Sequence, residues 1–109
     1  MTNQHILLCP GQGAQAVGMG KTWCDASPAA AALFAHADHL VELDGGARLS
    51  TLCFEGPTEH LNRTDVSQPA LFTCGLACHA AMVEQGGEVP IVGALGLSLG
   101  EYTALALAG

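Results

Sequence analysis

The sequence predicts an α/β fold with a parallel sheet, because two short apolar runs are separated by helical segments. The first run, His5–Cys9, ends at Pro10-Gly11, and the second, residues 90–95, ends at a glycine-rich turn. Short apolar runs bounded by glycine or proline are typical of strands buried in a parallel sheet, and helices between them favour a crossover connection. Because two strands do not make a stable sheet, we expect residues 1–109 to be the N-terminal part of a larger domain.

The first half of the interval between the strands predicts a short helix and a longer one. Residues 21–26 have the composition of a helical turn. Ser27-Pro28 then supplies an N-cap serine and a proline at the first helical position. Residues 29–43 are amphipathic and end at Asp44-Gly45-Gly46. The apolar positions fall within roughly a third of the helix circumference: Leu33, Phe34, Ala37, Leu40 and Val41.

The second half of the interval predicts two short helices and one long, buried helix. Residues 49–54 are stopped by Gly56-Pro57, and residues 58–62 make another turn or two. Residues 70–83 are apolar almost all round and are closed by Gly86-Gly87. Their length favours a helix over a strand, and their even apolar character predicts burial. After the second strand, a tight turn leads into a helix over residues 101–108.

Composition and charge exclude several classes of function. The chain has 109 residues, with 3 lysines and arginines against 10 aspartates and glutamates, so its formal net charge is −7. This balance argues against binding to nucleic acid or to an anionic membrane surface, both of which attract clustered cations. No run approaches the ~18 apolar residues of a membrane span, and the N-terminal segment has no basic region of a secretory signal. The five cysteines are an odd number, and we expect buried or free thiols in a reducing cytoplasm.

The clearest chemical signal is Gly96-Leu97-Ser98-Leu99-Gly100, which fits the G-x-S-x-G pattern of a nucleophile elbow. In that turn a strand meets a helix sharply and exposes a strained serine at the tip. Side chains two residues before and after the serine would collide, so both positions are glycine. We predict Ser98 as a catalytic nucleophile and the N–H of Leu99 as a donor to the developing oxyanion. The alternative is a glycine-rich turn whose serine only caps the helix.

A serine nucleophile needs a general base, and the histidines of this chain are poor candidates. All five precede Ser98, whereas the histidine follows the serine in elbow enzymes. We expect three of them on exposed surfaces, one just before the first strand, and one satisfied in the buried helix. The three exposed ones are His36, His39 and His60, the one before the strand is His5, and the one in the helix is His79. We therefore expect the base to lie outside these 109 residues.

A second candidate site is the loop G-Q-G-A-Q at residues 11–15, after the first strand. Its glycines let the backbone approach a ligand closely, although the spacing is not that of a phosphate-binding G-x-G-x-x-G loop. An ordinary strand-to-helix connection is the alternative. Cys74, Cys78 and His79 are close in sequence, but no second ligand pair exists, so we predict packed thiols and no metal site. No cofactor is expected.

Three segments taken together resemble one enzyme family. Residues 9–15, CPGQGAQ, are similar to the opening F-P-G-Q-G-[SA]-Q of malonyl-CoA:acyl-carrier-protein transacylases. Residues 59–64, EHLNRT, and residues 68–71, QPAL, are similar to their E-x-L-N-x-T and Q-P-A-L stretches. Residues 96–102, GLSLGEY, resemble their G-H-S-L-G-E-[YF]. The order and spacing of these segments agree over the whole chain, so it resembles the N-terminal portion of that family.

The resemblance implies a large subdomain related to the α/β-hydrolase fold, here incomplete, and a small ferredoxin-like subdomain that is absent from residues 1–109. It implies ping-pong transfer of malonyl from malonyl-CoA, through an ester on Ser98, to the phosphopantetheine thiol of acyl carrier protein in fatty acid biosynthesis. Matched by position, the backbone N–H groups of Gln12 and Leu99 resemble the family's oxyanion hole. The loop at residues 11–15 is then expected to face the turn across the site.

The sequence departs from the family pattern in two ways. Leu97 stands where the family has a histidine before the serine, which leaves acyl selectivity open. The family's catalytic histidine and its malonate-binding arginine lie beyond Gly109. Three alternatives stay open: an acyltransferase domain of a polyketide synthase, an esterase on the same elbow, and a truncated, inactive chain. The short segment before the first strand favours a discrete enzyme, and the few cations predict that an acidic carrier protein docks mainly elsewhere.

Overall fold

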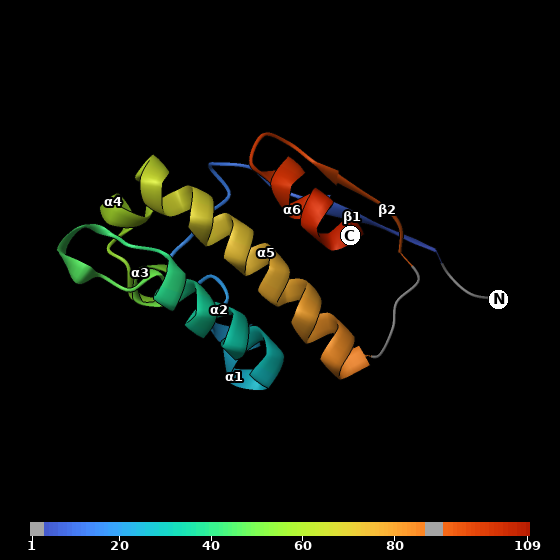
Figure 1. The fold of residues 1–109 in the computed structure, drawn as a ribbon, viewed down its shortest axis with the longest axis horizontal. Helices are drawn as coiled ribbons and strands as arrows, with labels where there is room; N and C mark the ends of the chain where they lie inside the picture. The colour runs from blue at the N-terminus through green and yellow to red at the C-terminus, as the bar shows by residue number, and fades with distance from the viewer. Residues whose placement is uncertain (1–3, 87–90) are drawn as a thin grey trace.

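The chain has one strand near its N-terminus and one near its C-terminus, and most of its helices lie between them in sequence. The structure, a computed structural model, describes residues 4–86 and 91–109. Two predicted boundaries lie outside the described residues: Gly87, after the long buried helix, and Pro90, at the start of the second strand. Figure 1 shows the elements in chain order: β1 (His5–Cys9), α1 (Lys21–Ala26), α2 (Pro28–Leu40), the 3₁₀ turn η1 (Asp44–Gly46), α3 (Leu49–Glu55), α4 (Thr58–Leu61), α5 (Thr64–Gly86), β2 (Ile91–Gly96) and α6 (Gly100–Ala108).

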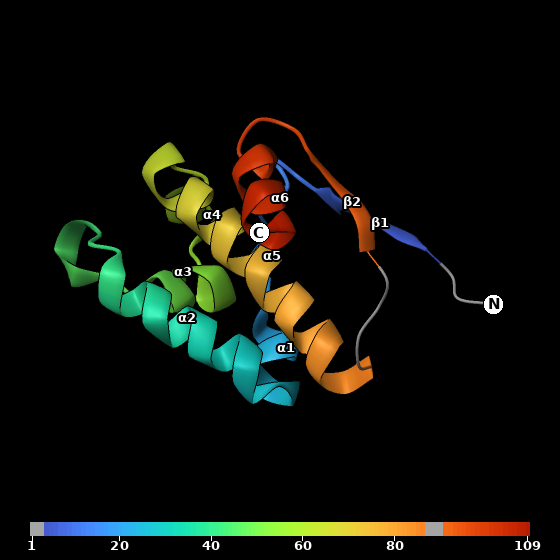
Figure 2. The same cartoon turned by 45° about the vertical axis from the view of Figure 1, so that its right-hand side comes forward.

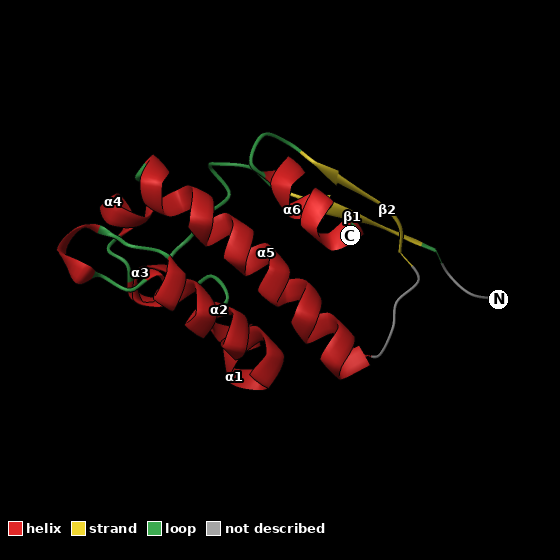
Figure 3. Cartoon of the chain, viewed as in Figure 1, coloured by secondary structure: helices red, strands yellow, loops and turns green. Residues whose placement is uncertain are grey.

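The two strands pair in parallel, which confirms the predicted α/β class (Figure 3). Leu7 pairs with Ala94 and Leu8 with Leu95, after a shift of register between His5 and Ile6. Helices α1 to α5 form the crossover between the strands, and α6 follows β2 directly and packs on both strands. The carboxyl ends of β1 and β2 therefore lie next to each other.

Helix α5 is the centre of the packing. It contacts α1, α2, α3, α4 and α6, and Figures 1 and 2 show it between the strand pair on one side and α1 to α3 on the other. No residue of α5 from 69 to 83 is exposed, which confirms the predicted buried helix. Small side chains at helical spacing let the neighbouring helices approach closely. The buried core is formed by Ala30, Phe34, Leu49, Leu52, Cys53, Leu61, Val66, Ala70, Cys74, Ala77 and Ala81.

The sequence expectation counted only consecutive apolar residues, and the length of α5 adds a second measure. The helix has 23 residues and, by length and composition alone, is long and apolar enough to cross one. Polar residues such as Thr73 and His79 interrupt its apolar run, so a search for consecutive apolar residues misses it. The core helix of a soluble protein passes the same test, and α5 packs against its neighbours as such a helix does.

Helix α5 also begins earlier than predicted. It starts at Thr64, ahead of the apolar stretch expected from residue 70, and Pro69 lies inside it. Proline predicts a helix break because it lacks the N–H and crowds the preceding turn. Here the first turn forms ahead of the proline, since the N–H groups of Val66 and Ser67 both donate to the carbonyl of Arg63, at 3.0 and 2.7 Å. Both side chains are buried, so tertiary packing also stabilises this turn.

Helix α2 starts as predicted but ends early. The N–H of Ala30 donates to Ser27 Oγ at 3.1 Å, which confirms the N-cap. The helix ends at Leu40 instead of residue 43, and the side chain of Leu40 is 65% exposed although it was expected in the buried stripe. Val41 and Leu43 pack against the core from extended backbone. Their apolar character therefore reflects tertiary packing and not helical periodicity, which is why the pattern overestimates the helix.

The strands are far less buried than their apolar character predicts. In β1 only Cys9 is buried, and Leu8 is 76% exposed. Its partner Leu95 on β2 is 62% exposed, and because opposed residues of parallel strands share a face, both lie on the same side of the sheet. The prediction of burial on both faces is therefore wrong for the described residues. Helix α6 covers one face, and no described element covers the other.

Candidate active site

The turn between β2 and α6 holds Ser98 in a left-handed backbone conformation. Its φ is +53°, and among residues 4–86 and 91–109 it is the one non-glycine residue with a positive φ. Such a conformation costs on the order of 1–2 kcal/mol, because Cβ approaches the neighbouring backbone. β2 ends at Gly96 and α6 begins at Gly100, so the chain reverses within the residues between them. Ser98 is exposed at the tip.

Glycine is required on both sides of this turn. A Cβ on Gly96 would overlap the backbone carbonyl of Gly100, and a Cβ on Gly100 would overlap the carbonyl of Cys9 at the end of β1. The N–H of Gly100 donates to the carbonyl of Leu97 at 2.9 Å and closes the turn. Side chains at the two glycine positions would therefore collide with backbone, as the pattern predicts. The second glycine also lets α6 begin directly against β1.

The loop after β1 lies against the same turn. A Cβ on Gly11 would stand 2.5 Å from the carbonyl oxygen of Leu97 and 3.4 Å from the Cβ of Ser98. The N–H of Leu97 donates to the carbonyl of Cys9 at 3.4 Å, which continues the pairing of the strands. Figure 1 shows the blue connection after β1 and the orange connection after β2 close together. Ligands of open α/β sheets bind at such carboxyl ends of strands.

Four backbone N–H groups at the junction of the loop and the turn have no acceptor within the described ranges 4–86 and 91–109. They are the N–H groups of Gly11, Gln12, Ser98 and Leu99, whereas those of Gly13 and Gly100 have acceptors. The N–H of Gly13 donates to Gln15 Oε1 at 2.8 Å. Leu99 is the N-cap residue of α6, where unpaired N–H groups form the positive end of the helix dipole. The N–H groups of Gln12 and Leu99 are therefore among the donors left free for an anionic oxygen near Ser98.

The side chains of the loop are tied to the junction of α4 and α5. Gln12 Nε2 donates to Thr64 Oγ1 at 3.0 Å, and Gln15 Nε2 donates to Asn62 Oδ1 at 3.0 Å. Two of the sequence segments that resemble the transacylases thus contact each other. Sequence reasoning assigns no role to Asn62 and Thr64, although the E-x-L-N-x-T pattern was a signal that could have found them.

No histidine in the described part of the chain hydrogen-bonds Ser98. His36, His39 and His60 are exposed, as expected. His5, expected just before the first strand, is the first residue of β1 and is also exposed. None of the four makes a side-chain hydrogen bond to another described residue that would orient it. His79 is half-buried on α5 instead of enclosed in the core. A serine hydroxyl without a base is a weak nucleophile, so the described residues supply the turn and the donors but no base.

An apolar cavity of about 330 Å³ lies between β1, α1, α5 and α6. Its walls include Trp23, His79 and Met82, and none of Gln12, Ser98 and Leu99 lines it. The cavity is therefore separate from the arrangement around Ser98.

All five cysteines are free thiols, as predicted: Cys9, Cys24, Cys53, Cys74 and Cys78. Burial raises the pKa of the Cys53 thiol to about 12 and that of Cys74 to about 11. Thiols with such pKa values stay protonated near neutral pH and are poor nucleophiles. Among residues 4–86 and 91–109, no group of three or more histidine, cysteine or carboxylate side chains could hold a metal ion.

Comparison with known proteins places this arrangement in a family. The model of the acyl transferase domain family matches residues 6–109. The chain belongs to this family. The malonyl CoA-acyl carrier protein transacylase of Bacillus subtilis is 45% identical over 102 residues, which are 94% of this chain and 30% of that protein. The acyl-carrier-protein-S-malonyltransferase of Bartonella henselae superposes with a TM-score of 0.85 at 36% identity, over 100% of this chain and 33% of its own.

A polyketide enzyme is also similar. The acyltransferase domain from the second module of the salinomycin polyketide synthase superposes with a TM-score of 0.81 at 35% identity, over 100% of this chain and 24% of that one. The chain spans about a third of the length of the transacylases that it matches. These similarities confirm the family resemblance and an α/β fold shared with solved transacylases.

Proposed function

We propose that this chain is the N-terminal part of a malonyl-CoA:acyl-carrier-protein transacylase of fatty acid biosynthesis, with Ser98 as its nucleophile. The observation that carries the proposal is the left-handed Ser98 between β2 and α6, flanked by two glycines that admit no side chain. This geometry fits a nucleophile elbow of an α/β-hydrolase-like fold. The names of the relatives supply the substrate and the carrier protein.

The proposed chemistry is acyl transfer through an ester on Ser98. Ser98 Oγ bonds to the thioester carbonyl carbon of malonyl-CoA, and its proton passes to a general base. Negative charge that develops on the carbonyl oxygen is stabilised by the N–H groups of Gln12 and Leu99, which are unpaired in the described residues. The carbon–sulfur bond then breaks, and the coenzyme A sulfur takes the proton. The phosphopantetheine thiol of the carrier protein then gives its proton to the base and bonds to the ester carbonyl carbon. The bond from that carbon to Ser98 Oγ breaks, and Ser98 Oγ takes the proton back.

The general base belongs to the part of the enzyme beyond Gly109, as the family resemblance implies. The same holds for the arginine that binds the malonate carboxylate and for the small subdomain. This chain and that remainder together form the complete enzyme. Its proposed location is the cytoplasm, in keeping with five free thiols.

Carrier protein is proposed to dock mainly on the remainder of the enzyme. Two of the three cations of this chain already have acidic partners: Lys21 pairs with Asp25 at 2.6 Å, and Arg63 pairs with two aspartates. Arg48 alone is unpaired among the described residues, and a single exposed charge gives little electrostatic steering.

A polyketide acyltransferase domain is the second candidate, because the chain superposes almost equally well on one. Both candidates use the same turn and the same serine ester. They differ in the carrier that accepts the acyl group. Transfer to a free acyl carrier protein of fatty acid synthesis favours the first candidate, and transfer only to a carrier domain of a synthase favours the second.

The proposal is tested by malonyl transfer from coenzyme A to acyl carrier protein with the complete enzyme. Ser98→Ala should lower kcat by about 10³-fold or more, because a covalent mechanism loses its nucleophile. Ser50→Ala is a matched control, since Ser50 bonds Asp38 on α2, away from the turn, and should keep activity within about twofold. Transfer by Ser98→Ala at the wild-type rate would overturn the proposal.

A further inference from the structure

Two side chains at the α4–α5 junction hold the loop that carries one of the free N–H groups. We propose that Asn62 and Thr64 are positioning residues, which fix the backbone of Gln12 beside Ser98 through the side chains of Gln12 and Gln15. The inference rests on the proposed function, because it gives the N–H of Gln12 a role in binding the oxyanion.

The loop needs an external support. Between β1 and α1 the chain has no regular structure, and Gly13, Gly18 and Gly20 have φ values of +111°, +97° and +83°. Glycines at positive φ give the backbone wide freedom in the absence of other contacts. Around Gln12 the one backbone bond within the loop is from the N–H of Ala14 to the carbonyl of Gly11, at 3.2 Å. Backbone bonding alone therefore leaves the direction of the Gln12 N–H weakly defined.

The side chains supply the missing constraint from both sides of Gly13. On one side, Gln12 Nε2 donates to Thr64 Oγ1. On the other, Gln15 Nε2 donates to Asn62 Oδ1, which turns Gln15 Oε1 toward the loop, where it accepts from the N–H of Gly13 at 2.8 Å. A glutamine amide offers one acceptor and two donors, and Gln15 uses one of each in this relay. The loop backbone is thus connected to Asn62 through a continuous chain of hydrogen bonds.

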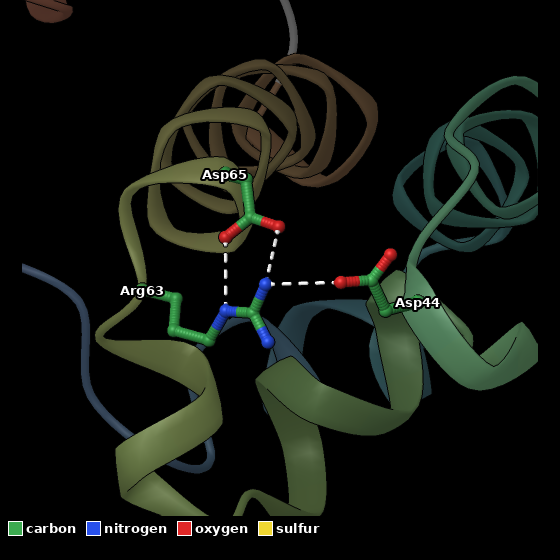
Figure 4. Close-up of polar contacts among 3 residues, drawn as sticks. All are labelled: Asp44, Arg63 and Asp65. Carbon is green, nitrogen blue, oxygen red and sulfur yellow. Dashed lines mark hydrogen bonds and ion pairs between the residues drawn. The ribbon is translucent and has the colours of Figure 1, made fainter.

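The support itself is firmly built. Figure 4 shows Arg63, which lies between the two positioning residues, with its guanidinium between Asp44 and Asp65. Its Nε and Nη2 donate to Asp65 at 3.1 Å each, and Nη2 also donates to Asp44 at 3.1 Å. A bidentate pair of this kind fixes geometry as well as adding energy. Thr64 is the first residue of α5, the central helix of the core.

The first test measures the rate at which malonyl-CoA acylates Ser98 in a single turnover of the complete enzyme. We call the hydrogen bonds from Gln12 to Thr64 and from Gln15 to Asn62 the two tethers of the loop. Thr64→Val and Asn62→Leu each remove one tether and keep the size of the side chain. We expect each to slow acylation about three- to tenfold, and the double variant about thirtyfold, with KM within about twofold. The acylation rate should fall while KM changes little, because the hydrogen bond to the oxyanion forms only in the transition state.

Two variants separate positioning from a general loss of structure. Thr64→Ser keeps the hydroxyl and should restore the wild-type rate. Glu59→Gln changes an exposed side chain on α4 at the same junction but leaves both tethers and the Arg63 pairs, and should stay within about twofold of wild type. Acylation by the Thr64→Val, Asn62→Leu double variant within twofold of wild type would overturn the inference.

A second test does not depend on catalysis. The N–H of Gly13 is bonded through the relay, so its hydrogen exchange in the complete enzyme should be slow, and Asn62→Leu should speed it at least tenfold. Thr64→Val should speed it less, since Thr64 holds the other side of the loop. If wild type forms no malonyl ester but Gly13 exchange responds in this way, the proposed function fails while the tethers are confirmed. Unchanged exchange in both variants would overturn the inference by itself.

Discussion

At the scale of single residues, the proposed chemistry depends on where backbone atoms lie more than on side chains. Ser98 adopts a conformation that L-residues avoid, and Gly11 brings the neighbouring loop within contact of the Leu97 carbonyl. Strain of this kind is found at functional sites, where the surrounding structure holds it in place. The consequence is that small changes of backbone at Gly11 should matter more than loss of the Gln12 side chain.

Gly11→Ala should lower kcat of the complete enzyme about 10²-fold or more. The added Cβ would stand 2.5 Å from the Leu97 carbonyl oxygen, so the loop must move away and take the Gln12 N–H with it. Loss of one oxyanion donor costs roughly 10²–10³ in rate. Gln12→Ala keeps the donor, loses only a tether, and should cost about three- to tenfold. Gly86→Ala at the end of α5 is the control, because its Cβ meets no atom within 4 Å.

These three variants are compared by steady-state kinetics with malonyl-CoA and acyl carrier protein. Equal, small effects of Gly11→Ala and Gly86→Ala would remove the loop from the active site. A larger effect of Gln12→Ala than of Gly11→Ala would show that the side chain, and not the backbone, acts on the substrate.

The Cys53 thiol should be unreactive and should couple stability to alkaline pH. Burial raises its pKa from the ordinary 9.0 to about 12, so the folded state keeps a proton that the unfolded state loses. The stability from this group is complete below pH 9 and is lost as pH rises toward 12. We expect Cys53→Ala to flatten the fall of the thermal midpoint between pH 9 and pH 11. Rapid alkylation of native Cys53 at pH 8 would contradict the raised pKa.

At the scale of elements, local sequence patterns predict most ends of the helices and strands, and tertiary packing explains the ends that differ from the prediction. Ser27-Pro28 predicted the start of α2, and the side-chain cap on Ala30 confirms it. The end of α2 was predicted late because Val41 packs into the core from extended backbone, and apolar periodicity does not distinguish the two cases. The start of α5 was predicted late because the prediction rested on the apolar stretch from residue 70, whereas the first turn before it is formed by buried, hydrogen-bonded residues of mixed polarity.

Ser27→Ala should destabilise the complete enzyme by about 1 kcal/mol. The hydroxyl is fully buried and accepts from the N–H of Ala30, so its loss leaves a helix donor without a partner. The effect appears as a lower midpoint of thermal unfolding, with transfer activity unchanged at temperatures where the enzyme is folded. Thr51→Ala, at an exposed position of α3, is the control and should change stability by less than about 0.5 kcal/mol. Equal midpoints for the two variants would contradict the cap.

Some features of the candidate site could be predicted from the sequence and others could not. The glycines on both sides of Ser98 follow from steric limits on a tight turn, so the sequence predicts that geometry. Which groups support the Gln12 loop does not follow, because Thr64 and Asn62 are separated from it by about fifty residues and only the folded chain brings them together. The exposure of Leu8 and Leu95 was not predictable from their apolar character, since pattern alone does not say which elements cover a face.

At the scale of the whole molecule, the chain carries a site on an incompletely covered sheet. Leu8, Leu95 and Leu97 are 76%, 62% and 77% exposed, and such neighbouring apolar side chains mark surfaces that other parts of a protein cover. The proposed function places the base outside these residues, so under it residues 1–109 are expected to need the remainder of the enzyme for activity.

Residues 1–109 expressed alone should therefore not transfer malonyl between coenzyme A and acyl carrier protein. We expect low solubility and binding of an apolar dye, because the open face of the sheet exposes leucine side chains. Addition of a separately expressed remainder should restore transfer if the two parts associate. Activity of the isolated chain that disappears in Ser98→Ala would contradict the prediction and would make one of its five histidines the base.

The central claim is that Ser98 carries the malonyl group, and the position of that group on the protein tests it most directly. The complete enzyme is mixed with malonyl-CoA, quenched in acid, digested and mapped by mass spectrometry. We predict one acid-stable malonyl ester, on the peptide that contains Ser98, and none in Ser98→Ala. Malonyl on Cys74 or Cys78, or rapid transfer to acyl carrier protein with no covalent intermediate, would contradict the claim.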